Sequence, residues 1–356
     1  MPEHAEVARI VHFIRKHLVG KTLSKVQAQH DDIVYGKVGT SAEEFQKSIQ
    51  GKKIVGAGQQ GKYFWITMSS PPHPVMHFGM SGWLKIKDAD TYYYRSDKPA
   101  DKEWPPKYTK FLLETSDEPK TEAAFVDARR LSRIRLVDCP ADEIRQHTPL
   151  KENGPDPVAD KDIVNESWLM EKLRKKRMPI KALLLDQANL SGIGNWMADE
   201  ILYHAKIHPE QISNTLSDGQ IKELHTAMYY VFTTALDVLA DSEKFPEHWL
   251  FKHRWGKGKK NQPSALPNGD KIIFVTVGGR TSAVVPAVQK KSGTVGKDED
   301  TSDTPKRKRV KHESDSEAEP KPVKSRPMTS KSKVKEEPEE KADAGIRRRS
   351  TRAHKK

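Results

Sequence analysis

The chain changes character near residue 292, and this change limits how much of it can fold. Residues 292–356 contain no Trp, Tyr, Phe or Leu, whereas all seven Trp residues lie between Trp65 and Trp255. A segment without large apolar side chains buries too little surface to offset the entropy that folding removes. We therefore expect a folded region over residues 1–291 and a disordered basic tail over residues 292–356.

Both regions carry a positive net charge. The chain has a formal charge of +13 and a pI of about 9.4. Residues 292–356 hold 19 Lys and Arg against 13 Asp and Glu, so +6 belongs to this segment and +7 to residues 1–291. An excess of basic residues favours a polyanionic partner such as nucleic acid. Charge alone fits equally well a surface that only confers solubility.

Cysteine content and hydrophobicity exclude several classes of protein. Cys139 is the only cysteine, which excludes a disulfide within the chain and a zinc finger with cysteine ligands. No apolar run is long enough to cross a bilayer, and the start of the chain lacks the apolar core of a signal peptide. We expect an intracellular, soluble protein that needs neither a metal nor another cofactor.

The periodicity of apolar residues predicts an α+β chain. Residues 5–18 have the spacing of an amphipathic helix. Short strands are expected at residues 21–26, 53–57, 63–68, 75–78, 83–87, 109–114, 123–127 and 133–137, which favours a β-sandwich or a barrel. After a linker around Gly154–Pro157, helices are expected at residues 166–174, 180–185, 196–205 and 218–240, followed by a hairpin of 271–277 and 282–286.

The first residues, Met1-Pro2-Glu3-His4-Ala5-Glu6, suggest covalent amine chemistry. Removal of Met1 would leave Pro2 with a secondary amine, and an α-amine has a reference pKa of about 7.7–8.0, low enough to be partly neutral at pH 7. Such an amine attacks a sugar carbon to form an iminium, and Glu3 and Glu6 lie close enough to move protons. An ordinary helix start also favours proline and acidic residues.

Three further runs are candidates for contact with DNA in the sandwich half. Lys62 precedes an apolar strand, Met80 lies in a turn between two glycines, and Arg129 and Arg130 follow a strand. A lysine contacts phosphate, a methionine fills a stack vacated by an extruded base, and arginine binds phosphate or base edges. The alternatives are a solvated lysine, a core methionine and ordinary surface charge.

The helical half contains a second set of candidates. The run Gly192-Ile193-Gly194-Asn195 opens a predicted helix, where backbone N–H groups and the helix dipole favour an anion such as a phosphate. Lys181 lies one helix earlier, and Arg280 stands at the tip of the expected hairpin. An exposed arginine on a hairpin is equally consistent with solubility.

Taken in this order, these runs resemble the formamidopyrimidine-DNA glycosylase and endonuclease VIII family across nearly all of residues 2–291. The resemblance implies a bifunctional DNA glycosylase and abasic-site lyase of base-excision repair, acting by β,δ-elimination on double-stranded DNA that contains oxidised bases or abasic sites. It implies catalytic roles for Pro2, Glu3, Glu6, Lys62 and Arg280, and DNA contacts for Met80, Arg129, Arg130, Lys181, Asn195 and Arg280. The alternative is a non-catalytic DNA- or chromatin-binding protein that keeps the same fold.

The departures from the family pattern point to one branch of it. The usual opening Pro-Glu-Leu-Pro-Glu-Val is altered at His4 and Ala5, Leu131 replaces a frequent aromatic wedge, and the four zinc-binding cysteines are absent. The chain resembles the zincless-finger branch of plants and fungi. We also expect a monomer that enters the nucleus, because Pro305–Lys311 fits a nuclear localisation signal.

The resemblance also implies a domain order. We expect a two-layer β-sandwich with an N-terminal helix over 1–140, a linker over 141–160 and a helix–two-turns–helix DNA-binding domain over 161–250. A zincless β-hairpin finger over 251–291 and the tail over 292–356 complete the chain.

Overall fold

The computed structural model describes residues 2–91, 103–256 and 265–291, so the expected tail lies outside the described residues. The described residues belong to one unit, Met1–Gly296. Its helices are α1 (His4–His17), α2 (Ala42–Ile49), α3 (Glu166–Lys175), α4 (Ile180–Leu185), α5 (Asn195–His204), α6 (Asp218–Asp237) and α7 (Leu250–His253). Its strands are β1 (Leu23–Ala28), β2 (Ile54–Gln60), β3 (Tyr63–Met68), β4 (His73–His77), β5 (Trp83–Ile86), β6 (Thr109–Thr115), β7 (Glu122–Val126), β8 (Arg133–Val137), β9 (Ile273–Val277) and β10 (Arg280–Val284).

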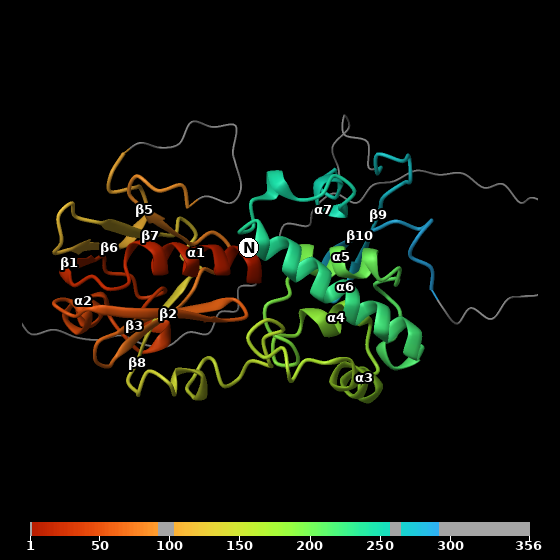
Figure 1. Ribbon diagram of the computed structural model, residues 1–356, viewed down its shortest axis with the longest axis horizontal. Helices are drawn as coiled ribbons and strands as arrows, with labels where there is room; N and C mark the ends of the chain where they lie inside the picture. Colours follow the sequence, from red (N-terminus) through yellow and green to blue (C-terminus); the bar gives the residue numbers. More distant parts are fainter. Residues whose placement is uncertain (1, 92–102, 257–264, 292–356) are drawn as a thin grey trace, which may run out of the picture. The chain divides into compact units, whose positions relative to one another are not determined.

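Strands β1 to β8 form a sandwich of two antiparallel sheets, one ordered β1-β6-β7-β5 and the other β2-β3-β4-β8 (Figure 1). Alternate residues of β3 are buried, as a strand with one face on a core requires. The core between the sheets contains a row of aromatic rings, in which Phe64 stacks on Phe78 at 4.5 Å and Phe78 on Phe125 at 5.5 Å. The prediction of an N-terminal β-sandwich is confirmed.

Helix α1 joins the two halves of the described chain. Its apolar face, which includes Ile10 and Ile14, packs into the sandwich core and contacts β2 and β3. Its first turn belongs to the other half, because Ala5 lies in the core of the helical region and α1 also contacts α6. The N-terminal residues are thereby placed where the two cores meet.

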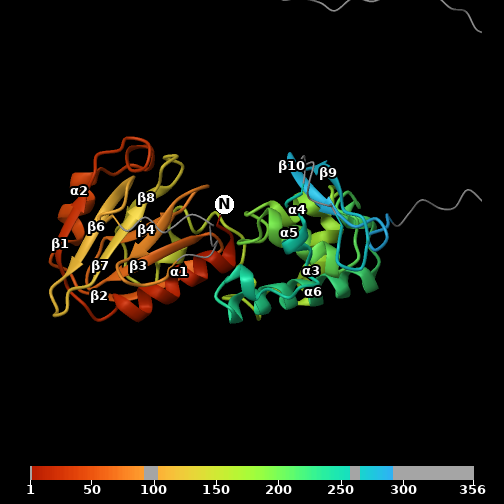
Figure 2. The same cartoon turned by 90° about the horizontal axis from the view of Figure 1, so that it is seen from above.

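Helices α3 to α6 build the helical region, as predicted, around a core that contains Trp196 and Trp249. The strands β9 and β10 form the expected hairpin, which contacts α5 (Figure 2). Gly278 and Gly279 connect them with φ values of 57° and 71°, the left-handed backbone of a two-residue hairpin turn. Val277 therefore pairs with Arg280, which becomes the first residue of β10.

Helices α2 and α7 were not predicted from the sequence. Ser41 begins α2 by accepting a hydrogen bond from Glu44 N at 3.0 Å, so the Ser-x-x-Glu spacing was the available signal. Helix α7 spans only four residues, too few for a periodic pattern. Within residues 2–91, 103–256 and 265–291, no helix is both long and apolar enough to cross a membrane. The expected domain boundaries stay predictions.

Candidate active site and nucleic-acid interface

The Glu3 side chain lies at the beginning of helix α5. Its carboxylate accepts hydrogen bonds from the backbone N–H groups of Gly194 (2.9 Å), Trp196 (3.0 Å) and Met197 (3.1 Å). The first N–H groups of a helix lack partners within the helix, and the helix dipole favours a negative charge there. The glycine-rich turn therefore holds a carboxylate of the protein itself. Glu3 therefore occupies the N–H groups of Gly194, Trp196 and Met197 in this structure, and contact of Asn195 with a DNA phosphate stays a prediction.

Gly194 allows this approach. A Cβ atom at this position would lie 2.2 Å from Cδ of Glu3, so any larger residue would displace the carboxylate. Glu3 is buried, and the loss of hydration raises the pKa of its carboxyl group, while Lys62 and the backbone donors act in the opposite direction. A buried carboxyl group held by three donors has a fixed orientation, which proton transfer requires.

Glu6 lies beside Glu3. One carboxylate oxygen accepts from the backbone N–H of Glu3 at 3.0 Å, and the other accepts from the indole Nε1 of Trp196 at 2.9 Å. Burial raises the pKa of Glu6 to about 7, and repulsion from the charge of Glu3 contributes to this shift as the second largest cause. Two adjacent carboxyl groups thus share a buried site, and one of them titrates near neutral pH.

Lys62 approaches the same site from the turn between β2 and β3. The buried ammonium group donates to the carbonyl oxygen of Ile193 at 2.8 Å, in the turn before α5. Burial lowers the pKa of Lys62, whereas Glu3 and Glu6 raise it. The structure therefore brings Lys62 together with both carboxyl groups. Pro2, also buried, precedes Glu3 directly in the chain.

Arg280 is exposed at the start of β10. Its positive charge is close enough to contribute to the lowered pKa of Lys62. Asn195 supports this hairpin, because its side-chain amide donates to the carbonyl oxygen of Thr281 at 3.0 Å. Asn195 and Arg280, both predicted to contact DNA, are thus connected through Thr281, which follows Arg280 in the chain.

Lys181 is completely buried, so its ammonium group has no access to a DNA phosphate in this structure. It forms an ion pair with Asp199 of α5. Asp199 also accepts from Arg254 at 2.5 Å and from the backbone N–H of Ala283 in β10 at 3.0 Å. Lys181 therefore helps to hold the hairpin against α5, a role that sequence analysis did not assign to it.

Two neighbouring turns of the sandwich expose candidate wedge residues. The side chains of Met80 and Leu131 are 37% and 38% exposed, so both can contact a ligand. Asp127 joins the turns, because it accepts from the Ser81 hydroxyl at 2.6 Å and from the backbone N–H of Ser132 at 2.8 Å. Leu131 was not among the predicted site residues, although its position beside Arg130 was the available signal.

The structure separates the two adjacent arginines. Nε and Nη2 of Arg130 donate to the carboxylate of Asp31 at 3.0–3.1 Å. Arg129 is exposed, and its backbone N–H donates to Asp127 at 3.1 Å. Arg129 is therefore available to a ligand from this turn, whereas the guanidinium of Arg130 is held by the sandwich.

His4 and Asp156 were missed as site residues. Asp156 lies in the run that sequence analysis treated only as a linker, yet it is 1% exposed and binds the side chain of His4. Their local sequences carry no signal for this pairing, because 151 residues separate them and only the fold brings them together.

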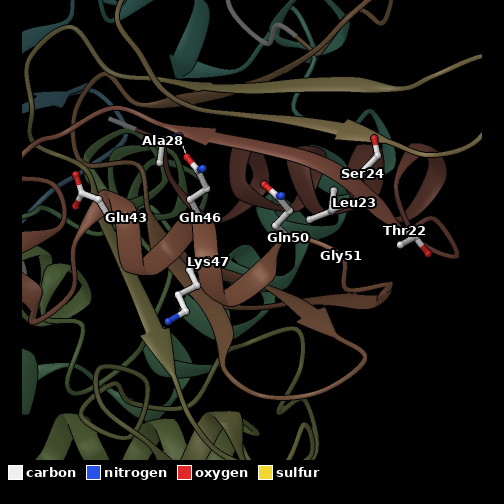
Figure 3. Close-up of a pocket in the computed structure, with 9 residues that line it drawn as sticks. All are labelled: Thr22, Leu23, Ser24, Ala28, Glu43, Gln46, Lys47, Gln50 and Gly51. Carbon is white, nitrogen blue, oxygen red and sulfur yellow. Dashed lines mark hydrogen bonds between the residues drawn. The ribbon is translucent and has the colours of Figure 1, made fainter.

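A cavity of about 560 Å³ lies elsewhere, between α2 and β1 (Figure 3). None of the candidate catalytic residues lines it. At its wall the side-chain amides of Gln46 and Gln50 accept from the backbone N–H groups of Ala28 and Val26 on the outer strand β1. These contacts cover unpaired groups of a sheet edge, so the cavity has a structural explanation.

Comparison with known proteins assigns the family. Residues 1–134 match the formamidopyrimidine-DNA glycosylase N-terminal domain, and residues 154–246 match the formamidopyrimidine-DNA glycosylase H2TH domain. The chain is 42% identical over 294 residues to formamidopyrimidine-DNA glycosylase of Arabidopsis thaliana, covering 82% of this chain and 72% of that protein. It is 30% identical over 300 residues to the protein of that name from Pelotomaculum thermopropionicum, covering 82% and 99%.

Solved structures agree with this assignment. The formamidopyrimidine-DNA glycosylase of Lactococcus lactis, non-covalently bound to DNA that contains an AP site, matches with a TM-score of 0.64 and 26% identity, covering 81% of this chain and all of that chain. A complex of the wild-type L. lactis protein with DNA containing N7-benzyl-Fapy-dG matches with a TM-score of 0.63 and 25% identity, covering 82% of this chain and all of the other. Because both matched domains, the 42% identity over 82% of its length and the shared fold point to the same proteins, the chain belongs to the formamidopyrimidine-DNA glycosylase family.

Proposed function

We propose that this chain is a DNA glycosylase of base-excision repair that removes oxidised bases from double-stranded DNA and then cleaves the strand at the abasic site. Its substrates would include formamidopyrimidines and other oxidised guanine products. The observation that carries the proposal is the buried cluster of Glu3, Glu6 and Lys62 beside Pro2. Such a cluster provides a nucleophile next to groups that move protons.

Base removal begins at the Pro2 nitrogen, which is a free secondary amine once Met1 has been removed. Its lone pair attacks C1′ of the damaged nucleotide, and the C1′–N bond breaks, so the base leaves with the electron pair and takes up a proton. The attacking nitrogen gives up its own proton to a neighbouring basic group, and its lone pair then forms the C1′=N bond of an iminium as the bond from C1′ to the ring oxygen breaks. A carboxyl group such as Glu3 supplies the proton that the released ring oxygen takes up. Burial raises the pKa of the Glu3 carboxyl group, so it exchanges a proton closer to neutral pH than an exposed glutamate does.

Strand cleavage uses the iminium as an electron sink. Loss of a proton from C2′ expels the phosphate at C3′, the β-elimination, and a second elimination expels the phosphate at C5′. Lys62 is the candidate for proton transfer at the sugar, because burial lowers the pKa of its ammonium group. Arg280, exposed and near Lys62, would bind a phosphate during the second elimination.

Reaching C1′ requires the damaged nucleotide to leave the stack, which costs a few kcal/mol and least for a poorly stacked base. Met80, Arg129 and Leu131 project from adjacent turns and are the candidates to fill the vacated space. Arg130 would add a phosphate or base contact while its ion pair with Asp31 orients it.

Borohydride trapping on abasic duplex DNA tests the proposal, because only an iminium is reduced to a stable covalent adduct. The wild-type chain should give the adduct, and Pro2→Gly should reduce trapping and base release severely while affinity for the duplex changes little. The alternative, a non-catalytic DNA- or chromatin-binding protein, predicts binding without any adduct from the wild-type chain.

We also propose that the chain acts as a monomer in the nucleus. The basic run Pro305–Lys311 supports nuclear import. A fluorescent fusion with residues 306–309 changed to alanine should remain cytoplasmic, whereas equal nuclear accumulation of both fusions would contradict this location. Sedimentation of the purified protein, free and with one duplex, would reveal a dimer if one forms.

A further inference from the structure

His4 connects separate parts of the catalytic region although it is buried beneath them. Only 3% of the residue is exposed, and Nε2 lies 3.0 and 3.1 Å from the two carboxylate oxygens of Asp156, itself 1% exposed. The ring packs edge-on against Phe232 of α6, with the centroids 5.0 Å apart. A buried pair with this geometry holds both side chains in one orientation.

Asp156 extends the connection to the turn that carries Lys62. One carboxylate oxygen accepts from the backbone N–H of Gly61 at 2.7 Å, while the other accepts from Val158 at 2.8 Å and Ala159 at 3.1 Å. His4 directly follows Glu3, and Gly61 directly precedes Lys62. The pair therefore joins the backbones of two catalytic candidates through a single carboxylate.

The backbone of His4 makes further contacts with the same turns. Its N–H donates to the carbonyl oxygen of Gly192 at 3.2 Å, and its carbonyl accepts from Gln59 Nε2 at 2.8 Å. Gln59 Nε2 also donates to the carbonyl oxygen of Gly61 at 2.9 Å. Gly192 has a φ of +100°, and a Cβ there would lie 2.9 Å from Cδ2 of His4. Three distant segments of the chain thus meet at this histidine.

We propose that His4 and Asp156 form a clamp that sets the distance between the Pro2–Glu3 terminus and Lys62, which makes His4 a positioning residue of the glycosylase. This inference rests on the proposed function. Small displacements of reacting groups reduce rates strongly, so a rigid link between a nucleophile and its proton-transfer partners favours the chemical step over binding.

Two substitutions of similar polarity separate this role from simple packing. The amide nitrogen of His4→Gln can reach the position of Nε2 and donate to Asp156, whereas the shorter His4→Asn cannot. We would measure the single-turnover rate of borohydride trapping on abasic duplex, and the Kd for a duplex with a tetrahydrofuran abasic analogue. His4→Asn should lower the trapping rate at least about 10-fold with Kd within about 3-fold of wild type, and His4→Gln should restore the rate to within about 3-fold.

The alternative outcomes are distinct. Equal trapping rates for wild type, His4→Asn and His4→Gln would overturn the clamp but leave the proposed function intact. A loss of affinity as large as the loss of rate would also overturn it, because the pair would then support the fold in general. If His4→Asn does not fold, His4→Gln decides alone, and a rate well below wild type refutes the clamp. A wild-type chain that binds DNA but forms no adduct would refute the proposed chemistry, and the clamp with it.

Discussion

Glu3 and Glu6 illustrate, at the scale of residues, how two acidic side chains acquire different properties. Glu3 receives three backbone N–H groups at the start of α5, whereas Glu6 receives one backbone N–H group and the Trp196 indole. Burial disfavours the ionised form of each, and the charge of Glu3 disfavours ionisation of Glu6 further. The pair provides a proton donor and acceptor near neutral pH.

Glu6→Gln should change how stability depends on pH. The pKa of Glu6 is raised from an ordinary value of 4.5 to about 7, so the folded state binds the proton more tightly than the unfolded state. The associated stability is present below pH 4.5 and is lost as the pH rises through about 7. In urea titrations, wild type should lose about 3 kcal/mol over this window relative to Glu6→Gln. If the unfolding free energies of the two proteins change in parallel with pH, Glu6 does not have the raised pKa assigned to it.

Gly194→Ala tests the carboxylate site sterically. The added Cβ would displace the Glu3 carboxylate, because it would lie only 2.2 Å from Cδ of Glu3. We expect a loss of about 1 to 3 kcal/mol in unfolding free energy, from buried groups left without partners, together with a strong loss of trapping rate. Gly219→Ala in the first turn of α6 is the matched control, because its Cβ would meet only Ser217 Oγ at 4.0 Å. Similar behaviour of the two variants would argue against the role of Glu3.

Helix α5 is the element that organises the site. Its first N–H groups hold Glu3, Asp199 in its middle holds Lys181, Arg254 and the backbone of β10, and Glu200 accepts from the first residues of α7. Asn195 adds the contact with Thr281. One helix thus fixes both the catalytic terminus and the hairpin that carries Arg280.

This arrangement predicts a shared effect of Asn195→Ala and Arg280→Ala. Arg280→Ala should weaken binding to abasic duplex about 10-fold, through loss of a charged phosphate contact, and raise the ratio of β- to δ-elimination product. Asn195→Ala should weaken binding to lesion-bearing and abasic duplexes alike and shift the products in the same direction, because it releases the hairpin. Their effects should be non-additive in the double variant. Affinity titrations measure the change in binding, and product gels on the same duplex measure the ratio of β- to δ-elimination. Lys271→Ala removes an exposed positive charge elsewhere and is the control for charge.

At the scale of the whole molecule, the candidate residues in the described chain are positioned by two separate hydrophobic cores. The sandwich supplies Lys62 and the turns with Met80 and Leu131, and the helical region supplies the site for Glu3 and the hairpin. Helix α1 contributes to both cores. The residues after 291 add charge but no Trp, Tyr, Phe or Leu.

Truncation after residue 291 should therefore leave a folded and active enzyme. Removing residues 292–356 removes a net charge of +6, so the salt dependence of DNA binding should become shallower. Base release under single-turnover conditions should stay within about 3-fold of the full chain at low salt. Loss of a cooperative thermal transition, or of lesion cleavage, in the truncated protein would refute this prediction.

The sequence by itself determined the elements and most of the chemical groups of this protein. Periodicity located α1, β3, β8 and α4 closely, because each buries one regular face, and the order of short runs identified Pro2, Glu3, Glu6 and Lys62 as candidates. Helix α2 was missed although the Ser-x-x-Glu spacing at Ser41 marks its beginning.

The tertiary structure alone decided which groups meet. A glycine-rich helix start looks the same in sequence whether it binds a phosphate or a carboxylate, and only the fold shows that Glu3 occupies it. Equally, nothing local distinguishes Arg129 from Arg130, or marks His4 as the partner of Asp156. These roles depend on contacts between residues far apart in the chain, and such contacts exist only once both cores have packed.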